Sequence, residues 1–229
     1  MPIKALIFDL DDTLWPIAPL IQYAESTLHA WIGEVLPALT AQYSIEDLRN
    51  RRQALMLTDV RFSFDLWALR HTLLKQVFAE HGAHHSLADQ AMQVFATARN
   101  QVSLYEDVMP ALNMLKHHFV LGSISNGFAD VAAVGLHQHF SASIAAHTFG
   151  CAKPDTKIFH AMAQSLKLEP AELMYIGDDL RLDVQGAQLA GLTGVWLNRR
   201  NLSLEEAGHP NITPDLIVKD LQELLQKLL

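Results

Sequence analysis

Apolar residues follow two different periods along the chain. Between Ile3 and Phe8, five of six residues are apolar, and the run ends in acidic residues. Because this run is too short for a helix, it predicts a strand that is buried on both faces. From Ile17 to Val35 the apolar residues recur at helical spacing instead. The chain therefore begins with a strand and continues as helix.

Helical patterning continues well beyond this first helix. Ser44 and Asp47 have the spacing of a capping box at the start of another helix. Residues 65–81 predict a third helix, and Ser86 opens a fourth with apolar residues along one face. We therefore expect residues 15–103 to form an all-helical insertion after the first strand.

From Tyr105 onward, short apolar runs alternate with helical patterns. The expected strands are 119–124, 143–146, 173–176, 194–197 and 216–218, and the expected helices are 110–117, 129–134, 155–166, 182–189 and 220–229. Such alternation predicts a parallel sheet with right-handed crossovers and helices on both faces. The predicted fold class is therefore α/β, with a discontinuous core formed by residues 1–14 and 104–229.

The overall charge of the chain narrows the classes of partner. The chain has 229 residues and a net charge of −8. Its length suits one larger domain or a core with an inserted smaller domain. The negative charge disfavours binding to a nucleic-acid polymer or to an anionic membrane. A small phosphorylated substrate stays possible, because a local cation can dominate one pocket.

The single cysteine, Cys151, cannot form an intramolecular disulfide, which fits a reducing compartment. The first residues lack the pattern of a signal peptide, and no run of 18 apolar residues occurs. We therefore expect a cytoplasmic protein without a membrane partner. Nothing in the sequence indicates its oligomeric state.

Candidate chemistry begins where the first strand ends, at Asp9, Asp11 and Asp12. In open parallel sheets, ligands collect at the carboxyl ends of the strands. Three neighbouring carboxylates repel one another, so they favour a bound cation, and oxygen ligands suit Mg²⁺. The alternative is that these acids only end the strand and cap the next helix.

Two further strand ends carry groups that suit a phosphate. Ser125, Asn126 and Gly127 offer a hydroxyl, an amide and accessible backbone N–H groups, although the same triplet is also an ordinary turn. Lys153 offers a point charge for a phosphoryl group. The Pro-Asp pair that follows it is equally typical of the start of a helix.

A second acidic strand end follows Gly177, whose lack of a side chain permits a tight turn. Asp178, Asp179 and Asp183 lie within the next six residues. One of them can be an acid at a helix N-terminus, where the helix dipole favours negative charge. Two acidic strand ends in one parallel sheet nevertheless favour a site.

In these motifs the chain resembles the haloacid dehalogenase-like superfamily. The motifs occur in the order of that family, as Asp9-Leu10-Asp11-Asp12-Thr13, Ser125-Asn126, Lys153 and Gly177-Asp178-Asp179-Leu180-Arg181-Leu182-Asp183. The resemblance covers the whole chain. It implies a Rossmann-like core, and it implies that residues 15–103 are a helical cap of the family's first type.

The resemblance also implies roles for the acidic residues. Asp9 would be the nucleophile and a Mg²⁺ ligand, and Asp11 would be the general acid and base, with its backbone carbonyl on the metal. Asp178 would be the second metal carboxylate. Asp183 would orient Lys153 or a metal-bound water. Asp179 stands where the family often has a serine, so its role stays open.

The remaining roles concern the phosphoryl group. Thr13 would position the nucleophile loop, and Ser125, Asn126 and Lys153 would hold the phosphoryl group. The dehalogenating branch of the family lacks the second aspartate, here Asp11, so the resemblance favours hydrolysis of a phosphoester.

The expected reaction is Mg²⁺-dependent hydrolysis of a small phosphomonoester such as a nucleotide, flavin or sugar phosphate. A carboxylate that attacks phosphorus forms an acyl phosphate and divides one difficult step into two. A metal and a lysine offset the charge on the phosphoryl oxygens. Two alternatives remain, namely a phosphotransferase or mutase with the same intermediate, and a binding module without catalysis.

Four aromatic residues allow two interpretations. Trp15, Phe62, Phe64 and Trp67 lie just after the first acidic motif or within the expected insertion. They can form a stacking wall for a flat leaving group such as a nucleobase or a flavin, or they can pack between helices. The 12 histidines show no zinc-site spacing.

Overall fold

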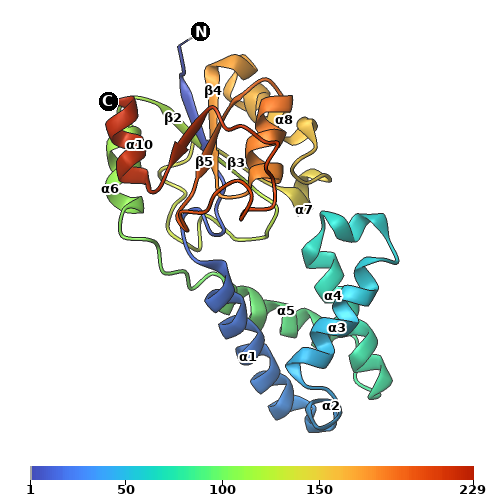
Figure 1. Ribbon diagram of the computed structural model, residues 1–229. Coiled ribbons are helices and arrows are strands. Elements are labelled where there is room, and N and C mark those ends of the chain that lie inside the picture. The colour runs from blue at the N-terminus through green and yellow to red at the C-terminus, as the bar shows by residue number, and fades with distance from the viewer. Residues whose placement is uncertain (1) are drawn as a thin grey trace.

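The computed structural model describes residues 2–229 as a sheet flanked by helices and a separate group of helices (Figure 1). Within these residues, six parallel strands pair in the order β3-β2-β1-β4-β5-β6. The strands are β1 (Ala5–Phe8), β2 (Val120–Ser125), β3 (Ala142–Ala145), β4 (Leu173–Gly177), β5 (Thr193–Leu197) and β6 (Leu216–Val218). This sheet confirms the predicted α/β class.

The helices fall into two groups along the chain. The first group, called the helical region below, consists of α1 (Ile17–Val35), α2 (Pro37–Gln42), α3 (Ile45–Met56), the 3₁₀ turn η1 (Val60–Ser63), α4 (Leu66–Glu80) and α5 (Ser86–Arg99). The second group, which together with the strands makes up the sheet region, consists of α6 (Val108–Leu115), α7 (Ala146–Phe149), α8 (Thr156–Leu166), the 3₁₀ turn η2 (Pro170–Glu172), the π-helical turn η3 (Leu180–Gln185), α9 (Gly186–Leu189) and α10 (Leu221–Leu228). None of the helices in residues 2–229 combines the length and the apolar character needed to cross a bilayer.

Strand β1 lies between β2 and β4 and is buried on both faces, as its apolar run predicts. Leu6 and Phe8 pack into the core that α6 and α10 cover, whereas Ala5 and Ile7 pack into the core beneath α8. Each large apolar side chain buried in this way contributes about 1.5–3 kcal/mol. The carboxyl end of β1, where Asp9 follows, is therefore anchored at the middle of the sheet edge.

The helical region has a hydrophobic core of its own. Leu28 and Ile32 of α1 pack with Phe78 of α4 and Phe95 of α5. Figure 1 shows this region extending from the edge of the sheet where the connections to α1 and from α5 meet. Its separate core is consistent with an insertion, although the division of the chain at residues 15 and 103 stays a prediction.

Two helices expected in the sheet region differ from the prediction. The helix expected at 129–134 is replaced by turns at 131–135, because the carboxylate of Asp130 accepts hydrogen bonds from the Ala132 and Ala133 N–H groups and Gly135 has a positive φ of +81°. The helix expected at 182–189 is instead η3 followed by α9. The wider π turn places Asp183 inward, within reach of Lys153.

Candidate active site

Lys153 is the centre of a buried polar network. Its ammonium group donates to Asp9 Oδ1 at 2.5 Å, to Asp183 Oδ1 at 2.5 Å and to the Tyr175 hydroxyl at 2.9 Å. These three partners use all three N–H groups of the ammonium. Burial alone would lower the pKa of Lys153, but the Asp183 and Asp9 carboxylates outweigh it and raise the pKa well above its usual value. Lys153 is therefore a fixed positive charge.

The backbone of Lys153 is held by Asn126. The Asn126 amide oxygen accepts from the Lys153 N–H at 2.8 Å, and the amide nitrogen donates to the Lys153 carbonyl at 3.0 Å. The prediction placed Asn126 on the substrate. In the structure this amide links the loop after β2 to the lysine loop through its oxygen and one of its two N–H groups. Its contact with the substrate stays a prediction.

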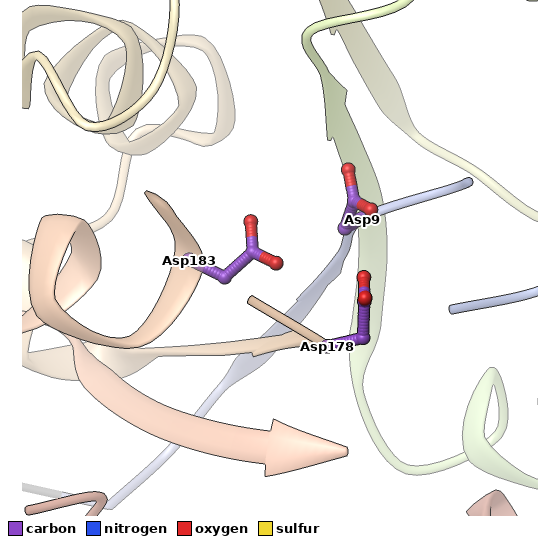
Figure 2. Close-up of side chains that lie close together, drawn as sticks. All are labelled: Asp9, Asp178 and Asp183. Atoms are coloured by element: carbon purple, nitrogen blue, oxygen red, sulfur yellow. The ribbon is translucent and has the colours of Figure 1, made fainter. Parts of the chain in front are cut away.

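Asp9, Asp178 and Asp183 form a carboxylate cluster at the ends of β1 and β4. One oxygen of each lies within 4.8 Å of the others, and Figure 2 shows the three side chains converging. Burial and the neighbouring Asp183 charge raise the pKa of Asp178 to about 7. Burial also raises the pKa of Asp9, although Lys153 opposes this effect.

This cluster fits a divalent cation of the Mg²⁺ type. Its donors are carboxylate oxygens, which hard cations prefer. The raised pKa values of Asp9 and Asp178 show that a lysine alone does not offset the buried negative charge. A bound cation would stabilise the ionised form of both groups.

Asp183 differs from the other two carboxylates, because the chain engages both of its oxygens. Oδ1 accepts from Lys153, and Oδ2 accepts from the Asp179 N–H at 3.0 Å. A Cβ at Gly177 would lie 2.2 Å from Oδ2, so only glycine leaves room for this carboxylate. Asp183 thus binds both Lys153 and the turn after β4.

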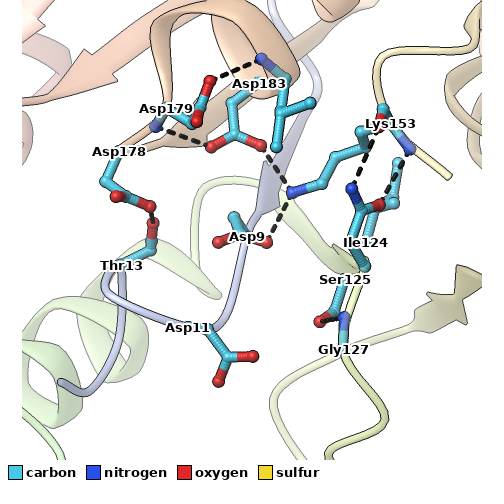
Figure 3. A network of polar contacts seen from close by, with 12 residues as sticks. Asp9, Asp11, Thr13, Ile124, Ser125, Gly127, Lys153, Asp178, Asp179 and Asp183 are labelled. Atoms are coloured by element: carbon cyan, nitrogen blue, oxygen red, sulfur yellow. Dashed lines mark hydrogen bonds and ion pairs between the residues drawn. The ribbon is translucent and has the colours of Figure 1, made fainter. Parts of the chain in front are cut away.

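The structure shows hydrogen bonds of Asp179 and Thr13 that the sequence alone did not indicate. Asp179 caps the π turn, since its Oδ1 accepts from the Arg181 N–H at 2.8 Å and the Leu182 N–H at 2.7 Å. The Thr13 hydroxyl donates to Asp178 at 3.4 Å, which links the two acidic loops. Figure 3 shows both contacts at the margin of the lysine network.

Asp11 points away from Asp9 and Lys153 (Figure 3). Arg99 Nη2 donates to Asp11 Oδ1 at 2.6 Å and to Oδ2 at 2.7 Å, and Trp15 Nε1 donates to Oδ1 at 2.8 Å. A Cβ at Gly127 would lie 2.7 Å from Oδ2, so the missing side chain allows this arrangement. In this conformation, Asp11 is held by the end of α5.

The hydroxyl of Ser125 is buried at the end of β2 and accepts from the Gly127 N–H at 3.0 Å. The hydroxyl therefore shapes the turn after β2, as the turn interpretation of the triplet predicts. Its position beside the lysine loop is also compatible with the expected contact to a phosphoryl group.

A model of the haloacid dehalogenase-like hydrolase family matches residues 3–191, which include every motif described above. The chain belongs to this family.

Solved structures with the same fold match nearly the whole length of the chain. A crystal structure described as a 2-haloacid dehalogenase from Pseudomonas syringae pv. Tomato DC3000 is 33% identical, covers 99% of this chain and 98% of its own, and has a TM-score of 0.91. A HAD phosphatase from Thermococcus onnurineus is 25% identical, with coverages of 99% and 98% and a TM-score of 0.71.

Curated relatives include the 5-amino-6-(5-phospho-D-ribitylamino)uracil phosphatase of Escherichia coli (strain K12). It is 29% identical over 226 residues, which cover 97% of this chain and 94% of the relative. A glyceraldehyde 3-phosphate phosphatase from Methanopyrus kandleri is also 29% identical, over 97% of this chain and 96% of its own length.

Two residues of this haloacid dehalogenase-like hydrolase were missed by the sequence reasoning. Tyr175 lies inside β4 and donates to the Ile124 carbonyl at 3.0 Å while it accepts from Lys153. Because Tyr175 lies within an apolar strand, the sequence pattern did not distinguish it as a residue of the site. Arg99, at the end of α5, could have been noticed as a cation near the return to the core, but no spacing rule connects it to Asp11.

The aromatic residues of this hydrolase mainly pack within the protein. Trp15 is fully buried in the core on the α6 side of the sheet, and Phe62 is also buried. Trp67 packs edge-on against Phe128 at 5.5 Å between ring centroids, and Phe64 contacts the core beneath α8. The packing interpretation therefore accounts for these contacts.

Proposed function

We propose that the chain is a Mg²⁺-dependent hydrolase of small phosphomonoesters, with Asp9 as the nucleophile. The observation that carries this proposal is the pairing of Asp9 with Lys153 beside Asp178 at the sheet edge. A carboxylate and a fixed cation at that edge suit a phosphoryl group with several negative oxygens. The phosphatases among the curated relatives, at 29% identity, support the same reaction class.

The first step forms a bond between a carboxylate oxygen of Asp9 and phosphorus. The bond between phosphorus and the leaving oxygen breaks, and Asp11 supplies the proton that this oxygen needs. In the second step, a water oxygen attacks phosphorus and gives its proton to Asp11. The bond between the Asp9 oxygen and phosphorus breaks, which frees the Asp9 carboxylate and releases inorganic phosphate.

The carboxylates of Asp9 and Asp178, with the backbone carbonyl of Asp11, would hold Mg²⁺, which supplies positive charge to the phosphoryl oxygens when bound. Lys153 contributes a second positive charge beside Asp9. Asp183 keeps the ammonium directed at Asp9, because it binds the same group at the same distance.

Asp11 has to leave Arg99 and Trp15 before it can reach the leaving oxygen. The hydrogen bonds to these two residues account for its present direction. The helical region would act as a cap in this proposal, because α1 begins beside Asp11 and α5 ends at Arg99. Its movement relative to the sheet would change the partners of Asp11.

A second candidate is the hydrolysis of a 2-haloacid, because a structure described as a 2-haloacid dehalogenase superposes with a TM-score of 0.91. A halide leaves as a stable anion and needs no proton, so this reaction gives Asp11 no task. It also needs no cation beside Asp178. The phosphomonoester reaction uses both groups and is the better match.

Turnover of p-nitrophenyl phosphate, measured with and without Mg²⁺, tests the proposal. We expect turnover with Mg²⁺, loss of it in chelator, and inhibition by excess Ca²⁺, which takes more and longer oxygen contacts. Asp9→Asn should remove turnover and leave the fold intact. Chloride release from 2-chloropropionate, without phosphate release, would favour the second candidate. Turnover only with an added acceptor alcohol would indicate a phosphotransferase, and no turnover would indicate a binding module.

A further inference from the structure

A cavity of about 270 Å³ lies between the helical region and the sheet region, directly beside Asp11. Its walls are mostly apolar, with Ile17 of α1 and Leu69 of α4 on the helical side and Phe128 on the sheet side. Three arginines, Arg52, Arg70 and Arg99, interrupt this apolar lining. A cavity of this size and composition is typical of a small-ligand site.

The arginines of the helical region outnumber the carboxylates near them. Arg49, Arg52 and Arg70 all reach the buried carboxylate of Glu25, at 2.6, 2.8 and 3.4 Å. One carboxylate therefore meets three guanidinium groups. Burial lowers the pKa of Arg70 to about 9, and the charge of Arg52 adds to this effect.

The fourth guanidinium group, that of Arg99, faces one carboxylate, that of Asp11. Arg49 also pairs with Glu46 at 3.2 Å, so the four arginines exceed the three acids, Glu25, Glu46 and Asp11, by one positive charge. The whole chain carries a net charge of −8, so this excess is local to the cavity. Such a local excess of positive charge attracts an anion.

Two residues that line the cavity each have one buried and unpaired N–H group. Arg70 Nε and Arg99 Nη1 have no hydrogen-bond partner among residues 2–229. The two residues are only 8% and 2% exposed. Buried guanidinium groups are normally fully hydrogen-bonded, because an unmade bond to a charged group is costly. Both donors therefore have hydrogen-bonding capacity that no described residue uses.

We propose that the cavity binds the leaving group of the substrate, and that this group carries a second oxyanion held by Arg70 and Arg99. The proposal rests on the proposed phosphomonoesterase function. The phosphoryl group would lie at Asp9 and the carbon skeleton against the apolar walls, so that a carboxylate or a second phosphate meets the free N–H groups.

The position of Arg99 connects this recognition to Asp11. An oxyanion bound to Arg99 competes with the Asp11 carboxylate for the same guanidinium group. Asp11 is then released to turn toward the leaving oxygen. A neutral leaving group makes neither contact, and it leaves the two buried donors unpaired.

Matched substrates test this inference. The ratio of kcat/KM for 3-phosphoglycerate to that for glycerol 3-phosphate compares a carboxylate with a hydroxymethyl group of similar size. The ratio for fructose 1,6-bisphosphate and fructose 6-phosphate tests a second phosphate. We expect at least one ratio to be roughly 10–100 in the wild type, because hydrogen bonds to charged groups are strong.

Two variants test whether Arg70 causes the preference for a charged leaving group. Arg70→Met keeps an unbranched apolar side chain but removes the guanidinium group, and it should reduce the larger ratio about tenfold or more. Arg51→Met is the matched control, because Arg51 lies on α3, pairs with Glu80 and does not line the cavity. The control should keep the wild-type ratio.

Calorimetry on Asp9→Asn gives a second readout, which does not depend on turnover. The protein with this substitution should bind 3-phosphoglycerate or fructose 1,6-bisphosphate more tightly than its matched neutral partner by a similar factor. Ratios near one in the wild type, or an unchanged ratio in Arg70→Met, would overturn the inference while phosphatase activity persists. Absence of any turnover of p-nitrophenyl phosphate would instead refute the proposed function.

Discussion

Single residues at the sheet edge are held by more than one partner. Lys153 binds two carboxylates and a phenol, and Asp183 binds the lysine and a backbone N–H. A charge that is buried and fully hydrogen-bonded is expensive to disturb, because removal of one partner leaves the other uncompensated. The network therefore orients the lysine and also contributes to stability.

Asp183→Asn tests this double role. We expect kcat for p-nitrophenyl phosphate to fall at least about tenfold, because Lys153 loses the carboxylate that directs it toward Asp9. Loss of one partner of a buried pair typically costs about 3–5 kcal/mol in the free energy of unfolding, which urea denaturation measures. Asp179→Asn is the control, since asparagine also caps helices and should leave both quantities near wild type. Equal losses in both variants would contradict this assignment.

His139 offers a pH-dependent test at a distance from the site. It is buried, and neither ring nitrogen has a partner within residues 2–229. Burial lowers the pKa of His139 below 6.5, with smaller contributions from Lys116 and His137. His139 therefore binds a proton more readily in the unfolded chain than in the folded chain. As a result, the free energy of unfolding decreases as the pH falls below about 6.5.

His139→Leu should remove this loss. The free energy of unfolding of the variant should exceed that of the wild type by an amount that grows between pH 7.5 and pH 5.5. His137→Leu, at an exposed position of the same loop, is the control for the substitution of one histidine by leucine. Parallel stability curves for wild type and His139→Leu would show that His139 titrates alike in both states.

Secondary-structure elements position the site mainly through their ends. Asp9 follows β1, Asp178 follows β4 and Arg99 ends α5. The sequence predicted the strand ends, because apolar runs that stop at acidic residues are a local pattern. It did not predict η3, in which Asp183 accepts a hydrogen bond from Lys153, 30 residues earlier in the chain, because no local pattern relates the two residues.

A pair of glycine substitutions tests the packing of two secondary-structure elements, β4 and α1. Gly177→Ala should lower the free energy of unfolding by more than about 1 kcal/mol and abolish turnover, because the new Cβ would overlap the Asp183 carboxylate, 2.2 Å away. Gly33→Ala lies inside α1 with its nearest contact at 3.4 Å, so it should raise stability by about 0.5–1 kcal/mol. Urea denaturation of both proteins measures the two effects. Tolerance of alanine at position 177 would contradict the described packing.

The whole molecule combines two hydrophobic regions, and the site lies where they meet. The sequence predicted the parallel sheet, the helical insertion and the residues of the acidic strand ends. It missed the contact between Arg99 and Asp11, which are 88 residues apart, because no local period relates them. Contacts between regions depend on how the helices are oriented, and a single sequence carries no direct signal for that orientation.

Trapping of the phosphorylated protein tests the central claim most directly. Asp11→Asn should still form the Asp9 acyl phosphate from p-nitrophenyl phosphate, because p-nitrophenolate leaves without a proton. Its hydrolysis should be slow, since general acid–base catalysis contributes about 10²–10⁴-fold. Rapid-quench measurement should therefore give a burst of p-nitrophenol approaching one equivalent, with acid-stable, hydroxylamine-labile phosphate on the peptide that contains Asp9. No burst, no trapped phosphate and equal slowing of alkyl and p-nitrophenyl phosphates would contradict the assignment of Asp9 and Asp11.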